Sequence, residues 1–230
     1  MPDTQPAEAP APNLVQPIAV VPGSHFETVA AVAIASNLAA AHADLDTEPW
    51  KAWLSRAFTK TVRRISKTAD ARFIAELSAA DPASHSFAVG GAVAYAFAPM
   101  AYEDFPKRLR NLQVSGLDVE RARAGFGVAA PAASGAAQTG QPQMLVSRDV
   151  AMTTGKTAAQ VAHALMVWLI QLRANDRDAF LAWREHPHLA VCMGDLDELS
   201  ADPAHTITIV DSGLTEIAPK TATVRMNRWQ

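Results

Sequence analysis

Three polar side chains stand at helical spacing in the second half of the chain. Lys156, Gln160 and His163 occupy positions i, i+4 and i+7, and the apolar residues around them form a separate stripe, so a helix would present the three on one face. A short apolar run at residues 143–147 precedes them, and residues 153–155 supply turn and N-cap chemistry. A helix N-terminus that carries a lysine can bind an anion, because its backbone N–H groups and its dipole point the same way.

This stretch has two other interpretations, of which one is rejected and one stays open. The tripeptide Gly155-Lys156-Thr157 matches the end of a nucleotide-binding P-loop, but that motif requires a glycine where the chain has Val150, so a P-loop is rejected. An ordinary amphipathic helix with a solvated lysine and a surface histidine stays open on the pattern alone.

Two motifs connect this part of the chain with a known family. The first consists of Arg148-Asp149, Met152, Gly155-Lys156, Ala158-Ala159-Gln160 and His163-Ala164. The second is Asp211–Val224, which reads DSGLTEIAPKTATV and follows a strand-like run. Together, and in this order, they resemble the signatures of the type 2 peptidyl-tRNA hydrolases, R-x-D-L-x-M-G-K-G-K-x-A-A-Q-x-x-H-A and D-A-G-x-T-x-I-A-P-G-T-x-T-V. The resemblance covers roughly residues 143–224, the C-terminal third of the chain.

The resemblance implies an enzyme that hydrolyses the ester bond of peptidyl-tRNA or of N-blocked aminoacyl-tRNA. It places Lys156, Asp211 and Thr215 at the family's functional positions and His163 at a further motif position. Lys156 would stabilise the negative charge on the carbonyl oxygen, and Asp211 would orient Lys156 or the water. Gln160 would support them by hydrogen bonding. A structural histidine at 163 and a turn-forming aspartate at 211 are the alternatives.

The chain also departs from the family pattern. Thr153-Thr154 replaces the first Gly-Lys pair, so one positive charge is lost, and Leu214 and Lys220 replace a frequent arginine and a glycine. These departures favour a second function class, a catalytically inactive relative that binds RNA or a protein partner through the same fold.

A segment without acidic residues offers a replacement for the lost charge. Residues 50–67 have apolar side chains at helical spacing and are predicted to form a helix. One face of that helix would be entirely basic in a chain of net charge −3, which favours contact with the tRNA backbone over a simple solvated face, and it would reinforce the site if it packs beside it. The residues predicted to bind tRNA are Arg56, Lys60, Arg63 and Lys67 on this face, and Arg148 in the first motif.

The order of the elements predicts an α/β protein. We expect a disordered tail at 1–25, a small α+β domain at 26–120, a flexible Gly/Ala/Pro-rich linker at 121–141 and a hydrolase-like domain at 142–230. By resemblance, the last of these is a small three-layer α/β/α domain with a four-stranded mixed sheet. Its segment 194–204 is acidic and loop-like where the family has a helix, so a homodimer partner or the N-terminal domain is expected to cover an open sheet face.

Composition limits the remaining function classes. A pI near 6.1 means that tRNA contact must come from a local basic patch. The single cysteine, Cys192, fits a reducing compartment, and no apolar run is long enough to span a membrane, so a cytoplasmic protein is expected. His186, His188 and Cys192 do not form a convincing metal site because a fourth ligand is lacking, so neither a metal nor another cofactor is expected.

Overall fold

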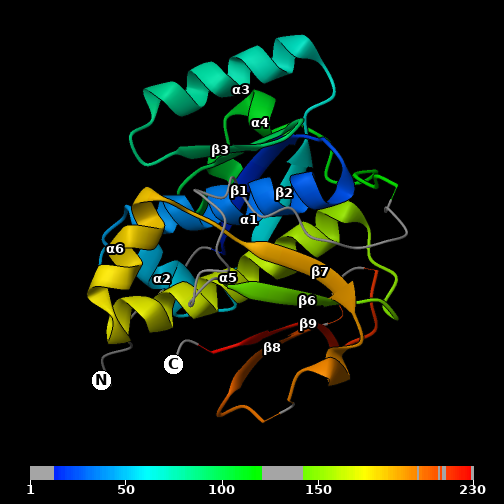
Figure 1. The fold of residues 1–230 in the computed structure, drawn as a ribbon. Coiled ribbons are helices and arrows are strands. Elements are labelled where there is room, and N and C mark those ends of the chain that lie inside the picture. Colours follow the sequence, from blue (N-terminus) through cyan, green and yellow to red (C-terminus); the bar gives the residue numbers. More distant parts are fainter. Residues whose placement is uncertain (1–12, 121–141, 201, 212, 214–215, 229–230) are drawn as a thin grey trace, which may run out of the picture.

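The computed structural model describes residues 13–120, 142–200, 202–211, 213 and 216–228. They form two mixed β-sheets with a layer of helices between them (Figure 1). The first sheet contains, in spatial order, β2 (Lys60–Arg64), β1 (Leu14–Val21), β4 (Ala92–Ala96) and β3 (His85–Val89), and the short β5 (Met100–Ala101) also pairs with β1. The second contains β7 (Ala190–Gly194), β6 (Gln143–Ser147), β9 (Thr221–Asn227) and β8 (Thr206–Asp211).

Two long helices form the middle layer, α1 (His25–Ala41) and α5 (Thr154–Asn175). Every residue of α1 except Glu27 is buried, and its many alanines allow neighbouring backbones to approach closely. One hydrogen bond joins the two helices directly: Asn37 Nδ2 donates to the carbonyl oxygen of Ala162 at 3.0 Å. The apolar residues of both helices and both sheets form a single hydrophobic core.

The remaining helices lie around these layers. Helices α3 (Thr68–Ala80) and α4 (Lys107–Arg110) cover the outer face of the first sheet, and α2 (Trp50–Leu54) and α6 (Arg177–Glu185) lie at one end of the middle layer (Figure 1). Two short 3-10 turns, η1 (Tyr102–Asp104) and η2 (Leu196–Glu198), complete the described elements. None of the described helices is long and apolar enough to cross a membrane.

The two sheets repeat one topology. In the first, β1 is parallel to β2 and antiparallel to β4, and β4 is antiparallel to β3. In the second, β6 is parallel to β7 and antiparallel to β9, and β9 is antiparallel to β8. In each half two helices connect the parallel pair, α1 and α2 in the first and α5 and α6 in the second. The N-terminal and C-terminal halves are thus two versions of the same arrangement.

The α/β class is confirmed, and several details differ from expectation. The elements predicted in the C-terminal half are present, but the outer layer of its sheet is reduced to η2 within the part of the chain that is described. The tail predicted for residues 1–25 is wrong from residue 14 onward, because β1 lies inside the first sheet. Residues 1–12 and the predicted linker 121–141 lie outside the described residues. The division into domains stays a prediction.

The basic helix predicted for residues 50–67 is wrong. It ends at Leu54, and Lys60–Arg64 form β2, which pairs in parallel with β1. Alternation along this strand sends Lys60 and Val62 toward the middle helical layer and Arg63 toward α4. The helical spacing of residues 50–67 did not decide the structure of this segment. Thr61 and Val62 are β-branched and favour a strand, and pairing with the distant β1 stabilises it.

Arg63 is buried within this arrangement and stabilises it. Its side chain is 2% exposed, and Nη1 donates to the carbonyls of Arg110 at 2.8 Å and Leu112 at 3.0 Å. Replacing Arg63 with methionine is expected to lower the free energy of unfolding by about 2–4 kcal/mol, since two buried carbonyls lose their donor. Urea unfolding measures this, with the exposed Lys67→Met as control. A loss of tRNA affinity without a loss of stability would contradict this structural role.

Candidate active site

A buried ion pair connects the first sequence motif with the second. Lys156, the third residue of α5, forms a salt bridge through Nζ with Oδ2 of Asp211, the last residue of β8. Gln160, one turn further along α5, donates from Nε2 to the same carboxylate oxygen at 2.7 Å. The backbone N–H of Gly213 donates to the other oxygen at 2.7 Å. With three neighbours holding it, the Asp211 carboxylate has a fixed orientation.

An irregularity in strand pairing helps to hold the network. Ile209 pairs with Val224 and Val210 with Ala222, so Thr223 is an extra residue on β9. Its hydroxyl lies 3.1 Å from Gln160 Oε1 and 3.2 Å from the carbonyl oxygen of Ile209, and its single hydrogen can be donated to either. The sequence motif contained Thr223, but its role depends on the bulge and was not predicted.

The surroundings of Asp211 keep it ionised. Burial alone would raise its pKa, but the hydrogen bond from Lys156, the Gly213 amide, the Lys156 charge and the Gln160 amide together hold the pKa below its ordinary value. At neutral pH the pair therefore consists of a carboxylate and an ammonium group. It is suited to electrostatic stabilisation rather than to proton donation by Asp211.

This lowered pKa makes the stability of the protein depend on pH. An aspartate with a depressed folded-state pKa stabilises the fold above its unfolded pKa of about 3.9, and that contribution is lost as the pH falls through the folded value. The difference in unfolding free energy between wild type and Asp211→Asn is expected to shrink as the pH drops below about 4. Urea unfolding from pH 7 downward measures it, with Asp46→Asn in an exposed turn as control. A difference that stays constant with pH would contradict the assignment.

The ion pair lies at the wall of a cavity of about 210 Å³ between the two halves. Residues of α5, β8 and the segment that leads into β2 line it, among them Lys156, Gln160, His163, Asp211, Phe58 and Lys60. The expected common face of Lys156, Gln160 and His163 is therefore confirmed. The contribution of the N-terminal half was expected only in the form of a helix.

His163 has an environment that keeps it neutral. Its ring lies 4.1 Å, centroid to centroid, from the ring of Phe58. Burial, and then the charge of Lys60, lower the pKa of His163 to about 3. An imidazole with this pKa is a weak base, so the position suits packing and hydrogen bonding better than proton transfer.

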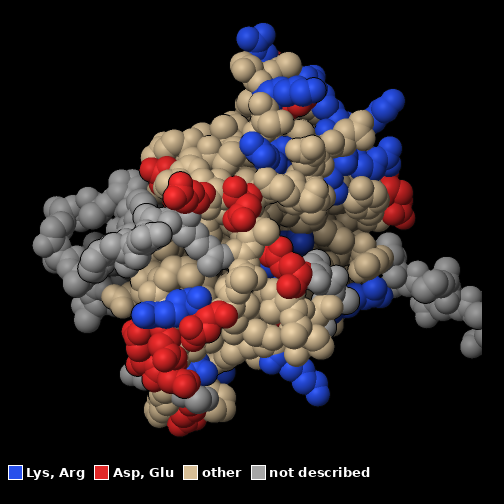
Figure 2. Space-filling model, turned by 90° about the vertical axis from the view of Figure 1, so that its right-hand side faces the viewer, with Lys and Arg blue, Asp and Glu red and all other residues tan. Residues whose placement is uncertain are grey.

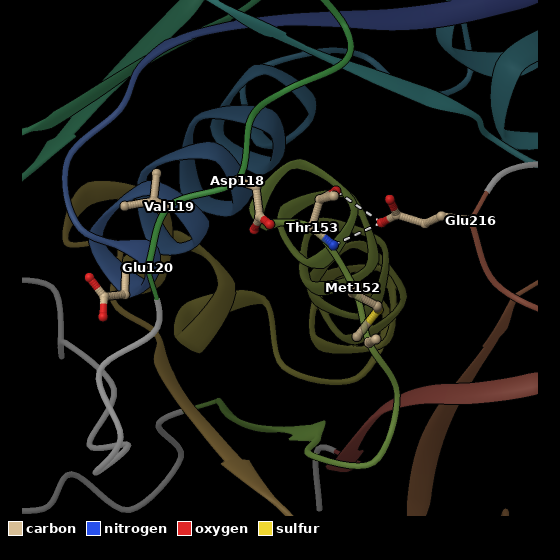
Figure 3. A pocket seen from close by; sticks show the side chains of 7 residues that line it. Asp118, Val119, Glu120, Met152, Thr153 and Glu216 are labelled. Atoms are coloured by element: carbon tan, nitrogen blue, oxygen red, sulfur yellow. Dashed lines mark hydrogen bonds between the residues drawn. The ribbon is translucent and has the colours of Figure 1, made fainter.

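The anion position at the start of α5 is already occupied by the chain itself. Glu216 accepts hydrogen bonds from the Thr153 backbone N–H at 2.8 Å and from its hydroxyl at 2.9 Å (Figure 3). A hollow of about 530 Å³ beside it is also lined by Asp118 and Glu120. These carboxylates would repel a phosphate, so the expected anion site at the helix N-terminus is not supported. The cavity with Lys156 is the better place for an anionic substrate.

The other predicted residues are spread over the molecule. Arg56 is exposed in the turn after α2, and Lys67 is exposed at the N-cap of α3. Arg148 is exposed beyond β6, where its Nη2 lies 3.3 Å from Oε1 of Glu198. The predicted common face of Arg56, Lys60, Arg63 and Lys67 is wrong for that reason. Thr215 lies outside the described residues. Within those described, His, Cys, Asp and Glu form no cluster of three or more that could hold a metal ion.

Known proteins share the segment that builds this site. Residues 142–226 match the family described as Peptidyl-tRNA hydrolase PTH2. The peptidyl-tRNA hydrolase of Thermoplasma acidophilum is 34% identical over 87 residues, which are 34% of this chain and 74% of that protein. The chain belongs to the peptidyl-tRNA hydrolase PTH2 family. The matched segment includes Lys156, Gln160, His163 and Asp211, so the buried network lies within the PTH2 part of the chain.

Charge is distributed unevenly over this PTH2 protein. Figure 2 shows Lys and Arg gathered over the upper part of one side, at the level of α3 and α4, and Asp and Glu gathered over the lower part. The exposed cations of the upper elements include Lys67, Arg72, Lys107 and Arg108. A local basic surface thus exists despite the net charge of −3.

Proposed function

We propose that this chain hydrolyses the ester bond of peptidyl-tRNA or of N-blocked aminoacyl-tRNA and releases the peptide and free tRNA. The observation that carries the proposal is the Lys156–Asp211 pair, held by Gln160 and lining a cavity, within the segment that matches the PTH2 family. The relative from Thermoplasma acidophilum, which is named a peptidyl-tRNA hydrolase, supports the same reaction.

The chemistry follows from the charges of the pair. Water attacks the ester carbonyl, and negative charge develops on the carbonyl oxygen. The tetrahedral intermediate then collapses, the bond to the ribose oxygen breaks, and the ribose oxygen takes up the proton that the water loses. The Lys156 ammonium group has three N–H donors and directs one toward Asp211, so others are available for the oxyanion. Asp211 holds the ammonium group in position and offers its carboxylate to the attacking water. Thr215, which follows Asp211 in the second motif, is proposed as a further functional residue.

The proposed partner is tRNA, and the proposed location is the cytoplasm, where translation supplies the substrate. Exposed Arg56, Lys67 and Arg148 are proposed to contact the tRNA backbone as separate surface charges rather than as one helix face. A homodimer also stays a prediction, and a measurement of the molecular mass of the protein in solution tests it.

The experiment that tests the function is multiple-turnover release of N-acetyl-amino acid from N-acetyl-aminoacyl-tRNA by the purified protein. Lys156→Ala, purified in the same way, is the matched control because it excludes a contaminating host hydrolase. We expect repeated turnover by the wild type and a loss of it in the variant.

The competing function predicts another result in the same preparation. If wild type shows no turnover above buffer but binds tRNA with a salt-dependent affinity, the chain is a binding relative that lacks activity. The occupied helix N-terminus and the loss of the first lysine of the motif, where the chain has Thr154, would then explain the missing activity.

A further inference from the structure

The N-terminal half has the same topology as the PTH2 half but lacks its functional side chains. When α1 and α5 are aligned from their N-caps, Ser24 and Thr153, the two helices match without gaps. The pairs with the same residue are Thr28/Thr157, Ala30/Ala159, Val32/Val161, Ala33/Ala162 and Ala35/Ala164. The three polar residues of α5 are not repeated in α1. Helix α1 has Glu27 where α5 has Lys156, Ala31 where α5 has Gln160, and Ile34 where α5 has His163.

This half instead contributes one wall of the other half's cavity. Ala57, Phe58, Thr59 and Lys60 line that wall, across from Lys156 and Asp211. Phe58 has a φ of 30°, a backbone conformation that is rare for a residue other than glycine and that is found more often at functional sites.

Lys60 is the unusual member of this wall. Its Nζ is buried and has no hydrogen-bond partner within the described part of the chain. Nζ lies 4.7 Å from the ring centroid of Trp53 and 5.1 Å from that of Phe58, so the ammonium group faces aromatic rings. Burial lowers the pKa of Lys60 to about 7, which reflects the cost of placing this ammonium group out of water.

The charged groups that line the cavity indicate which kind of ligand would pair with the Lys60 ammonium group. The titratable groups that line it are Lys156 and His163 on α5, Asp211 on β8, and Lys60 itself. Asp211 neutralises Lys156, and His163 is neutral, so the ammonium form of Lys60 has no counter-ion among them, and an anion bound beside it would favour that form. The scissile ester carries no charge, whereas the tRNA end that bears it carries phosphates.

We propose that Lys60 binds a phosphate oxygen of the 3′ end of the tRNA and thereby strengthens the binding of the substrate in the cavity that contains Lys156. This inference rests on the proposed function. Solvent does not reach Nζ in the structure, so the phosphate oxygen reaches it when the Phe58 ring moves aside. The N-terminal half then supplies a positive charge beside a motif that has lost one.

The test uses Lys60→Met, which keeps the length of the side chain and suits aromatic surroundings. We expect the KM for N-acetyl-aminoacyl-tRNA to rise about tenfold, as a lost charged hydrogen bond would give, with little change in kcat. The melting temperature is expected to equal or exceed that of wild type, because an unpaired buried charge is removed. The exposed Lys51→Met in the same half is the control, and Lys60→Gln repeats the measurement if the first variant does not fold.

Equilibrium binding separates this proposal from the proposed function, because it needs no catalysis. For deacylated tRNA, Lys60→Met is expected to weaken binding and to reduce the slope of log affinity against log salt by about 0.7, the value for one phosphate contact on a single strand. For tRNA that lacks its single-stranded 3′ end, wild type and variant should bind equally. An unchanged slope, or an equal loss of affinity on both RNAs, would overturn the role of Lys60 whether or not the ester is hydrolysed.

Discussion

Replacing Lys156 with alanine is expected to lower kcat/KM for N-acetyl-aminoacyl-tRNA by about 100-fold or more. In the proposed mechanism Lys156 is the cation that stabilises the negative charge developing on the ester oxygen, and loss of one such donor typically costs a factor of about 10² to 10³. Most of the effect should fall on kcat, because the interaction strengthens only as the charge forms. The initial rate of N-acetyl-amino acid release measures it.

The control for this variant is an exposed lysine outside the cavity. Lys51→Ala on α2 removes the same charge and the same number of atoms, so it should keep the wild-type rate. If Lys156→Ala hydrolyses the ester within a factor of about three of wild type, the ammonium group does not stabilise the transition state.

Replacing Asp211 with asparagine is expected to have a comparable effect on the rate. The amide keeps the shape of the side chain but removes the charge that faces Lys156 and accepts from Gln160. Lys156, of which only 15% of the side chain is exposed, then lacks its counter-ion and loses its fixed orientation. We expect kcat to fall about 100-fold and the free energy of unfolding to fall by about 1–3 kcal/mol.

Activity and stability have to be measured together for this variant. Asp46→Asn in an exposed turn makes the same chemical change and should alter neither quantity. A destabilised Asp211→Asn protein that keeps full activity per folded molecule would show that the carboxylate is structural.

The PTH2 half was predictable because its signals are local. The spacing of Lys156, Gln160 and His163 requires only a helix, and Asp211 follows a strand of β-branched residues that the sequence shows directly. Both motifs lie next to the elements that they were expected to follow. The approach of Asp211 to Lys156 depends on the sheet, and only the resemblance to the family indicated it.

The N-terminal half was predicted less well because its structure depends on distant pairing. Residues 60–64 look helical by themselves and become a strand only because β1, about 40 residues earlier, pairs beside them. With that change Arg63 turns inward and Lys60 turns toward the site. The occupation of the α5 N-terminus by Glu216 is likewise a contact across the fold that spacing does not reveal.

Lys156 and Asp211 are proposed to act as one unit in ester hydrolysis, and a double-mutant cycle is the most direct test of this cooperation. The measurement is the single-turnover rate of N-acetyl-aminoacyl-tRNA hydrolysis at saturating protein, for wild type, Lys156→Ala, Asp211→Ala and the double variant. Residues that work as a unit are strongly non-additive, so the double variant should be no slower than the slower single variant. Losses that multiply, or a wild type without turnover, would contradict the account.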